Sequence, residues 1–419
     1  MVLKLDSTKE LNRRLVLEQI RTQDAISRSE IVDATGLSKA AVSTLVAELM
    51  EAGLVEEVGS QSTAIGRPRI QLSLIREAGL ALGAELTNQE CRVILTDLRA
   101  TPLRHVEHPV AGTDLSPAKL LDCLQRCVEE VTADIDVSRI VGMGLTIPGV
   151  VDPSTATVLL SVLLPWRNVS LATELARRFP YPVAVFSRGS AATWGERWYG
   201  AGRNVRNMLY VRAGNGIVAG LVINGQPYLG QGFGAGELGH VTVQPEGALC
   251  RCGNRGCLAT VASSEALLNR MRQLLREHPD NPLWSALDNQ LEHLTLAELI
   301  GAALDGNQVA QQVFAEVARW FAVALASAIN LLNLDVIIVG GPLMAAGELL
   351  LQPLKAELGQ RALPTHLARV EIVASALREH APSIGAAGLI LHELMSPSPL
   401  PVKLAGFEDR DLLFSTVTV

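Results

Sequence analysis

The sequence predicts an α/β protein made of a small N-terminal winged helix-turn-helix and a larger α/β region with two lobes. Two observations carry this prediction, and a third feature predicts a metal site. The first 75 residues contain a helix capping box, a glycine turn and a second capped helix in close succession. From about Gly79 onward, short β-rich runs alternate with long helical stretches. The stretch CRCGNRGC, residues 250–257, gathers three of the six cysteines and predicts a metal site.

Composition limits the size, compartment and partners of the protein. The chain has 419 residues, of which 48% are hydrophobic and 19% charged, so two or three domains with large cores are expected. Its start, MVLKLDSTKE, lacks the apolar stretch of a secretory signal. The most apolar region, FAVALASAINLLNLDVIIVGG, is interrupted by Asn330, Asn333 and Asp335, which are unfavourable in contact with lipid. We therefore expect a cytoplasmic protein with no membrane partner.

The N-terminal part predicts three helices in order. STKELNRRLVLEQIRTQ, residues 7–23, places Leu11, Leu15 and Ile20 at roughly helical spacing. Ser27 and Glu30 then form a capping box, in which each side chain satisfies a free amide at the start of a short helix. Gly36 ends that helix, and Ser38 can cap the next one, SKAAVSTLVAELMEAG. The buried stripe of this third helix is predicted to be Val42, Leu45, Val46 and Leu49.

Small and polar side chains at the start of the third helix suit a recognition helix in the major groove of DNA. After Gly53, the stretch LVEEVGSQSTAIGRPRIQLSLI predicts a wing of two strands around a polar loop. Its segment Gly66-Arg67-Pro68-Arg69 has a stiff, extended backbone with two guanidinium groups, which suits a narrow minor groove. The candidate DNA-contacting residues are Ser38, Lys39, Ala40, Ser43, Thr44, Arg67 and Arg69.

A plainer alternative for this region is a three-helix packing unit without a nucleic-acid partner. The net charge of the whole chain is −7, and the first 75 residues contain about as many acidic as basic residues. The cationic groups would therefore have to lie on one side of the domain, with Lys9, Arg13 and Arg14 as further candidates for phosphate contacts. The order of capping box, glycine turn and wing favours DNA binding.

Strands and helices alternate through the rest of the chain. Hairpins are predicted at residues 81–98 and 207–225, a strand and turn at 139–152, and a buried strand at 334–342. Helices are predicted at residues 117–135 and 313–333. This pattern and length suit two related lobes.

Four residues offer the donors of a structural zinc site. His240, Cys250, Cys252 and Cys257 supply one imidazole and three thiolates, which fill a tetrahedral shell and leave no position for water. The single residue between Cys250 and Cys252 is tighter than the usual gap of two, so spacing alone is moderate evidence. The alternative is a set of free thiols beside an unrelated histidine. The other cysteines, Cys91, Cys123 and Cys127, are predicted to be small core residues.

The stretch GQGFGAGELGHVTV, followed by CRCGNRGCL, resembles the signature of the ROK family (repressors, open reading frames and sugar kinases). GLTIPGVVD, LDVIIVGG and SIGAAGLIL match other landmarks of that family. Together with the winged head, the chain resembles a ROK transcriptional regulator over nearly its whole length.

The resemblance implies a two-lobed, actin-like (ribonuclease H-like) fold with a ligand cleft between the lobes, and assembly as homodimers or homotetramers. It also implies one structural Zn²⁺ per chain on the four residues above, with Glu237 and His240 facing a sugar. We expect a DNA-binding domain at residues 1–78 and a first lobe at 79–199, completed by about 382–397. The second lobe, with the zinc site, is expected at 200–381, before a C-terminal tail at 398–419.

The same resemblance predicts that kinase activity is lost. ROK kinases need paired glycines in the first hairpin, where this chain has Gly83-Ala-Glu85-Leu-Thr87-Asn88-Gln89. The aspartate that serves as their general base aligns with Arg188, which cannot accept a proton at neutral pH. A glutamate that often follows the last zinc cysteine is replaced by Ala259.

The expected ligand-binding residues are Glu237, His240, Arg188 and Gly149. Three interpretations of Arg188 stay open. It selects an anionic ligand such as a sugar phosphate or sugar acid, it forms an internal salt bridge with Glu237 and leaves no sugar site, or the alignment is shifted by a few residues.

The predicted function is a repressor of carbohydrate uptake or catabolism genes, which binds a palindromic double-stranded DNA operator under the control of a sugar or sugar derivative. Two alternatives stand beside it. One is a sugar kinase with an added DNA-binding head, which a coupled ATPase assay with hexoses distinguishes. The other is a regulator that senses a protein partner, which a pull-down with and without sugars distinguishes.

Overall fold

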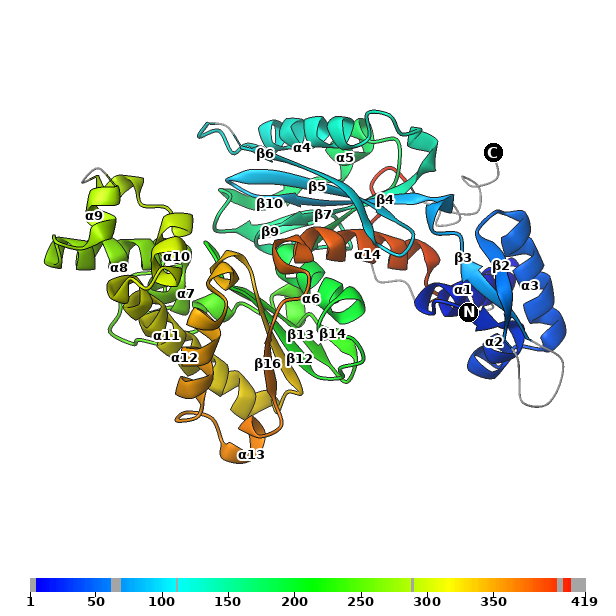
Figure 1. Cartoon of the computed structure of the whole chain (residues 1–419). Helices are drawn as coiled ribbons and strands as arrows, with labels where there is room; N and C mark the ends of the chain where they lie inside the picture. The colour runs from blue at the N-terminus through cyan, green and yellow to red at the C-terminus, as the bar shows by residue number, and fades with distance from the viewer. Residues whose placement is uncertain (1–4, 62–68, 111, 288–289, 398–401, 408–419) are drawn as a thin grey trace.

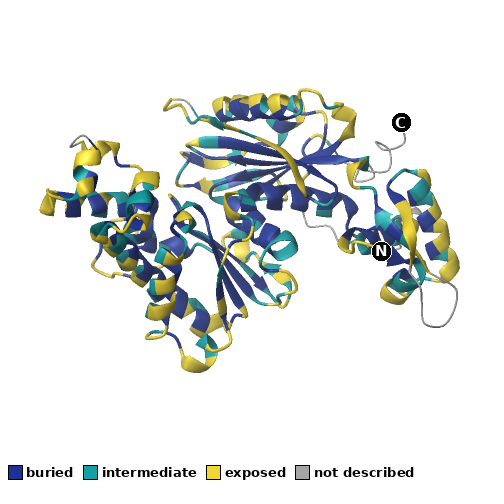
Figure 2. Ribbon diagram, in the orientation of Figure 1, coloured by how far each residue is buried: buried dark blue, intermediate teal, exposed yellow. Residues whose placement is uncertain are grey.

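The computed structural model describes residues 5–61, 69–110, 112–287, 290–397 and 402–407. It shows a small helical head at one end of the molecule and two sheet-containing lobes (Figure 1). Figure 2 shows that the inner strands of both large sheets are buried, whereas the outer faces of α3 and α4 are exposed.

The head consists of short helices around a small antiparallel sheet. Its elements are α1 (Leu5–Thr22), α2 (Arg28–Thr35) and α3 (Lys39–Glu51), with strands in the order β1 (Ile26–Ser27), β3 (Arg69–Leu74) and β2 (Val55–Gln61). The predicted capping box is present, because Ser27 accepts from the Glu30 amide and the Glu30 carboxylate accepts from the Ser27 amide. Gly36 ends α2 in the left-handed conformation. The predicted buried stripe of α3 is confirmed at all four positions.

The buried face of α1 differs from the prediction. Leu11 is 39% exposed, and the residues in the core are Val16, Leu17 and Ile20. Leu11 precedes Ile20 by nine residues, which at about 100° per residue places the two on opposite sides of the helix. The apolar residues of α1 therefore did not by themselves define which side meets the core.

Two of the further candidates for phosphate contacts, Arg13 and Arg14, form ion pairs within the head. Arg14 is 6% exposed and its Nε lies 2.9 Å from a Glu10 carboxylate oxygen, so it is not available to DNA and that prediction is wrong. Arg13 also pairs with Glu10. Lys9 remains mostly exposed, although its Nζ lies 2.7 Å from Glu48.

Replacing the capping residue is expected to destabilise the head measurably. Ser27→Ala removes the acceptor for the Glu30 amide and should lower the free energy of unfolding by about 1 kcal/mol. Chemical denaturation monitored by circular dichroism measures the change. Asp33→Ala, on the exposed side of the same helix, serves as the control and should have almost no effect. Equal effects of the two substitutions would contradict a capping role.

The first lobe is built on a mixed sheet. Its strands lie in the order β11 (Val183–Ser187), β7 (Ile140–Ile147), β4 (Leu80–Leu86), β5 (Glu90–Asp97) and β6 (Pro102–Pro109). β4, β5 and β6 form an antiparallel meander, and β7 and β11 continue the sheet in parallel. α4 (Pro117–Val131) packs on β5 and β6. Nearby lie α5 (Ala172–Arg178) and a small sheet of β10 (Trp166–Ser170), β9 (Thr157–Ser161) and β8 (Val150–Asp152).

The second lobe repeats this topology. Its strands lie in the order β14 (Gln226–Tyr228), β13 (Val218–Ile223), β12 (Met208–Arg212), β15 (Val336–Gly340) and β16 (Glu371–Ala374). Again an antiparallel meander is extended by two parallel strands beside its first strand. The helices of this lobe are α7 (Leu258–Ala262), α8 (Ser264–Glu277), α9 (Pro282–Ala286), α10 (Leu296–Leu304), α11 (Gln308–Leu332), α12 (Glu348–Leu358) and α13 (Pro364–Leu367). The prediction of two related lobes is therefore confirmed.

The long apolar helix α11 lies in the second lobe, where its buried residues belong to the main core. By length and composition α11 could cross a membrane, but core helices also meet that criterion, and 44% of its most apolar window is buried.

Two helices lie between the large sheets. α14 (Ala381–Met395) covers β4 and β7 of the first lobe, α6 (Arg188–Tyr199) covers β12 and β13 of the second, and the two helices pack against each other. Their approach is very close at Gly385, where a Cβ atom would lie 1.8 Å from the Ala191 carbonyl oxygen. The small residues in SIGAAG thus allow the two helices to meet.

The head and the first lobe share one continuous core. The buried residues of α1, α2 and α3 belong to the same cluster as Trp194 of α6 and Leu394 of α14. At the edge of this contact, Arg99 binds Asp24 of the head at 2.6 Å. In the C-terminal segment, residues 402–407 lie on the first lobe, where the Ala405 amide donates to the Val183 carbonyl at 2.8 Å.

Candidate functional site

The N-terminal part of α3 presents an exposed surface of small and polar side chains. Ser38 is the N-cap of α3 and accepts from the Ala41 amide at 3.2 Å. The exposed residues that follow are Lys39, Ala40, Ser43 and Thr44. They lie on the side of the helix opposite the buried stripe, and Figure 1 shows α3 on the side of the head away from the lobes. Their size and donor groups fit a major groove.

The wing supplies one described arginine. Arg69 is exposed at the start of β3, whereas Gly66, Arg67 and Pro68 lie outside the described residues. Arg28 ties the wing to α2, because its Nη2 lies 3.0 Å from the Glu57 carboxylate on β2. This ion pair thus links the wing to α2 within the head.

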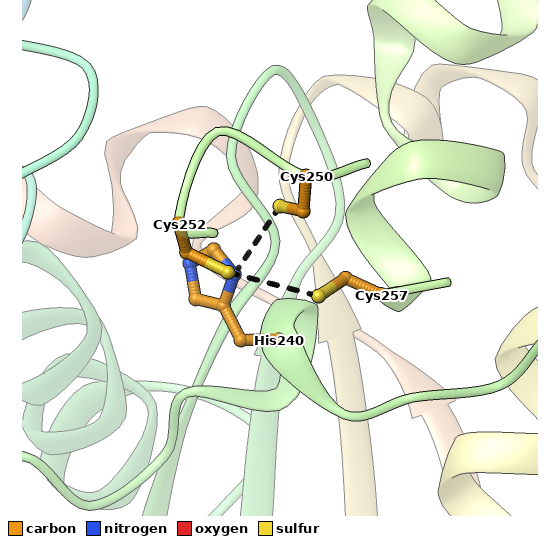
Figure 3. A group of neighbouring side chains, drawn as sticks. All are labelled: His240, Cys250, Cys252 and Cys257. Carbon is orange, nitrogen blue, oxygen red and sulfur yellow. Dashed lines mark hydrogen bonds between the residues drawn. The ribbon is translucent and has the colours of Figure 1, made fainter. Parts of the chain in front are cut away.

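The structure brings together the four predicted metal ligands (Figure 3). Their donor atoms, one imidazole nitrogen and three thiol sulfurs, all lie within 4.8 Å of one another. The Cys250 sulfur is 3.7 Å from Nδ1 of His240, and the Cys252 and Cys257 sulfurs are 3.8 Å apart. His240 ends the short 3₁₀ turn η4 (Leu238–His240), and the cysteines come from the loop that leads into α7.

These distances fit a tetrahedral zinc ion. With Zn–S near 2.3 Å and Zn–N near 2.0–2.1 Å, the edges of the tetrahedron are about 3.8 Å between sulfurs and about 3.6 Å between sulfur and nitrogen. The loop closes on itself at Gly256, whose φ is +65° and where a Cβ atom would lie 1.6 Å from the Gln244 carbonyl oxygen. The donor set and its spacing therefore match a closed, structural type of site.

The second ring nitrogen of His240 faces a pocket. Its Nε2 lies 3.9 Å from the Glu237 carboxylate, and both side chains line a cavity of about 550 Å³. Burial raises the pKa of Glu237, while the neighbouring His240 acts in the opposite direction. A metal ion on Nδ1 would fix this ring and hence the direction of Nε2.

The pocket is lined by both apolar and polar side chains. Its polar side includes Arg188, Asn215, Glu237 and His240, and Gly149 lies at its edge. The apolar lining residues include Pro148, Val150, Leu160, Val162, Leu163 and Ile217. A cavity of this size, with apolar and polar lining residues, suits one small molecule. Ala259, which replaces the glutamate expected in the family, also lines it.

Arg188 makes an internal ion pair, but with a different partner from the one proposed from the sequence. Its Nη1 lies 3.6 Å from the Glu85 carboxylate on β4, and no ion pair joins it to Glu237 in the described part of the chain. The same Glu85 carboxylate lies 3.5 Å from Arg92 and 3.9 Å from Arg212. Burial, and secondarily Arg212, lower the pKa of Arg188 to about 10, and Glu85 opposes this shift.

The turn between β4 and β5, which would hold ATP phosphates in a kinase of the family, makes hydrogen bonds within the protein. The backbone amides of Gln89 and Glu90 donate to the Thr87 hydroxyl at 3.1 and 3.0 Å, so they are not directed at a phosphate. Glu85 is fully buried, and the Gln89 side chain binds Asn215 of the second lobe. Sequence analysis missed Asn215 as a pocket residue. Its position in the glycine-flanked turn AGNGI was the available signal.

The remaining three cysteines form a second group of thiols. Cys91, Cys123 and Cys127 lie within 4.8 Å of one another and are at most 4% exposed. They belong to the core of the first lobe, between β5 and α4, as predicted.

Two family models match the chain in comparison with known proteins. The model of the ROK family matches residues 81–393, and that of the MarR family matches residues 11–64. The xylose repressor of Caldicellulosiruptor bescii is 29% identical over 393 residues, which are 93% of this chain and 97% of that protein. The DNA-binding transcriptional dual regulator NagC of Escherichia coli strain K12 is 27% identical over 394 residues, covering 94% and 95%.

Solved structures show the same architecture. The crystal structure of a ROK family transcriptional regulator, a homologue of the E. coli MLC protein, has a TM-score of 0.80 and 25% identity, and the match covers 99% of this chain and 100% of that one. A ROK family glucokinase from Streptomyces griseus, in complex with glucose and AMPPNP, has a TM-score of 0.69 and 28% identity over 74% of this chain and 99% of that chain. The kinase match thus leaves out about a quarter of the chain.

Proposed function

The chain belongs to the ROK family, and we propose that it is a DNA-binding transcriptional repressor of carbohydrate genes, controlled by a sugar-type effector in the pocket between the lobes. The observation that carries this proposal is the combination of a MarR-type head, with an exposed recognition helix, and a ROK domain with a formed pocket. The similar xylose repressor and NagC support it. We place such a protein in the cytoplasm, with its DNA.

The chain is a regulator and not a sugar kinase. The similar proteins that match nearly its full length include a xylose repressor and NagC, and Arg188, which lines the pocket, takes the place of the kinases' proton acceptor if the resemblance is followed. A guanidinium group cannot take a proton from a sugar hydroxyl at neutral pH.

The head is proposed to bind one half of a palindromic operator. Ser38, Lys39, Ala40, Ser43 and Thr44 would face base edges or phosphates in the major groove, while the two wing arginines would reach the minor groove. A second copy of the chain would supply the other head, so we propose a homodimer or a dimer of dimers. The two recognition helices would lie one helical turn of DNA apart, or a multiple of it.

One Zn²⁺ per chain is proposed at His240, Cys250, Cys252 and Cys257. The donor distances support it, and four protein ligands leave no place for a reacting water. The ion would hold the loop against η4, and so fix the wall of the pocket that carries Glu237 and His240. The effector would be a neutral sugar, a sugar phosphate or a sugar acid, with Glu237, His240 and Asn215 directed at its hydroxyl groups.

Helix α6 is the proposed route from the pocket to the head. Its first residue, Arg188, lines the pocket, and the hydroxyl of its last residue, Tyr199, lies 3.5 Å from Nη1 of Arg21 on α1. Trp194 and Trp198 stack with 4.2 Å between ring centroids, which packs the helix firmly. With 12 residues it is about 18 Å long. A shift of its N-terminus on effector binding would therefore move its contact with the head.

Removing the hydroxyl at the end of this route should weaken the coupling. In Tyr199→Phe, we expect effector affinity and operator affinity to persist separately, while the effector-dependent change in operator affinity falls about threefold, since one hydrogen bond to a charged group is lost. Fluorescence anisotropy on labelled operator, with and without effector, measures this ratio. Tyr228→Phe, at a 56% exposed tyrosine on β14, is the matched control. An unchanged ratio in Tyr199→Phe would rule out this contact as part of the route.

Selection of genomic DNA fragments on the purified chain tests the function itself. We expect enrichment of a palindrome beside carbohydrate transport or catabolism genes, protected as two half-sites whose centres are about 10 base pairs or a multiple apart. A panel of sugars and sugar derivatives should contain a member that changes the affinity for this fragment. Binding without any preference among sequences would overturn the proposal.

A further inference from the structure

Building on the sugar-responsive function proposed above, we propose that the effector carries an anionic group, a carboxylate or a phosphate, and that the guanidinium of Arg188 binds it. The pocket would thus take an acidic carbohydrate and disfavour the corresponding neutral sugar. The inference names the chemical class of the effector and assigns its charged end to one side chain.

Arg188 combines burial with unused donors. The residue is only 4% exposed, yet it lines the pocket. Its Nη1 faces Glu85 at 3.6 Å, whereas its buried Nε and Nη2 have no hydrogen-bond partner among the described residues. Buried donors are normally satisfied, because an unpaired one costs free energy. Both atoms are closed to solvent, so a ligand acceptor would remove that cost once the side chain turns toward the pocket that it lines.

The two unused donors lie on one edge of the guanidinium group. Nε and Nη2 carry N–H groups that point in the same direction in the guanidinium plane, and this edge fits the two oxygens of a carboxylate or phosphate. A single hydroxyl could satisfy only one of these donors well. The geometry therefore favours a group with two acceptor oxygens over an alcohol.

Charges around the pocket lead to the same conclusion. Of the acidic side chains that line it, Glu265 pairs with Arg251 at 3.0 Å, and Glu237 lies beside His240. Glu85 is behind Arg188 and is shared with two further arginines, at 3.5 Å for Arg92 and 3.9 Å for Arg212. Arg92 has additional partners, with 2.7 Å to Glu107 and 3.3 Å to Glu90.

One carboxylate thus faces both Arg188 and Arg212. This leaves positive charge at the end of the pocket where Arg188 lies. Burial makes that charge costly, as the lowered pKa of Arg188 also indicates, and an anion would compensate it.

The rest of the pocket suits the uncharged part of such a ligand. Asn215, Glu237 and His240 offer donors and acceptors for hydroxyl groups, and the apolar lining residues can cover the face of a sugar ring. An acidic sugar would therefore find an anion site and hydroxyl sites within one cavity.

Calorimetry on the full-length, zinc-loaded chain tests the inference. The probes are glucose, glucose 6-phosphate, gluconate and glucuronate, with the matching set for galactose, xylose and N-acetylglucosamine. We expect at least one anionic probe to bind at least tenfold more tightly than its neutral counterpart, and the phosphate and carboxylate arms of the panel identify the group. Tighter binding of a neutral sugar, or no binding by any anionic probe, would overturn the proposal.

Variants of Arg188 make the test specific. Arg188→Met should weaken the anionic probe at least 100-fold and bring it to the level of the neutral sugar. Arg188→Lys keeps a charge beside Glu85 but loses the two-donor edge, and should weaken it about tenfold. Arg167→Met, at an exposed arginine outside the pocket lining, should change nothing. Zinc content and melting temperature report whether each variant folds.

Unchanged affinity in Arg188→Lys and Arg188→Met, with both variants folded, would refute the assignment. A separate measurement of operator binding distinguishes failure of this inference from failure of the proposed function. A chain that binds its operator and responds to a neutral sugar would retain the proposed function and lose only the inference about charge.

Discussion

Ser43→Glu in α3 is expected to weaken operator binding by about 100-fold while leaving the fold intact. Ser43 is exposed in the first turns of the recognition helix, on the face opposite the buried Val42, Leu45 and Val46. In the major groove a glutamate there would lose a donor to a base or phosphate and place a negative charge against the DNA backbone. Losing a base contact costs about 1–3 kcal/mol, and the repulsion adds to it.

Fluorescence anisotropy with the selected operator, at two salt concentrations, measures the effect. Ser285→Glu, an identical substitution at an exposed serine of α9 in the second lobe, is the matched control and should leave operator affinity unchanged. Both variants should melt at the temperature of the parent chain, since neither position is buried. Full affinity in Ser43→Glu would mean that α3 does not enter the groove as proposed.

Cys252→Ser is expected to remove most of the bound zinc and, with it, the zinc-dependent part of the stability. Cys252 is the exposed cysteine of the site, so serine at this position disturbs packing little and mainly removes a ligand. With free zinc at about 100 times its Kd, binding stabilises the folded state by about 2.7 kcal/mol. For a lobe of this size, this corresponds to roughly 5–11 °C in melting temperature.

The measurement is zinc content by atomic absorption and melting temperature with and without a chelator. We expect about one zinc per chain in the parent, little in Cys252→Ser, and a chelator effect only in the parent. Effector affinity should fall with the metal, because His240 and Glu237 line the pocket beside the site. Cys123→Ala removes a thiol from the other cysteine group and should retain the zinc. An equal chelator effect in Cys252→Ser and the parent would contradict the zinc assignment.

Features that depend on near neighbours in the sequence were predicted well. The capping box of Ser27 and Glu30 and the glycine end of α2 follow from hydrogen bonds within a few residues. The hairpin of β4 and β5 was predicted from two β-rich runs that are adjacent in the sequence. The four candidate metal ligands are also close in sequence, since Cys250, Cys252 and Cys257 share one loop and only His240 comes from another turn. In these places the local chain already contains all the groups that interact.

Features that depend on distant segments were predicted only in part. The partner of Arg188 is Glu85, 103 positions earlier in the chain, and not the nearer candidate Glu237. The partner in an ion pair depends on the order of the strands in the sheet. Glu85 lies on β4, and Arg188 directly follows β11, which only β7 separates from β4. Leu11 shows the same limit, because the buried side of α1 is set by the elements that pack on it.

The amino-acid sequence by itself determined the helix-turn-helix, the alternation of strands and helices, and the grouping of four possible metal donors, because each arises from interactions over a few residues. The tertiary structure alone decided how α14 returns to cover the first sheet, how the head joins the core of the first lobe, and why Arg188 has an unused, buried donor edge beside the pocket. These arrangements depend on burial and charge balance among segments far apart in the chain, which become defined only when the whole core is packed.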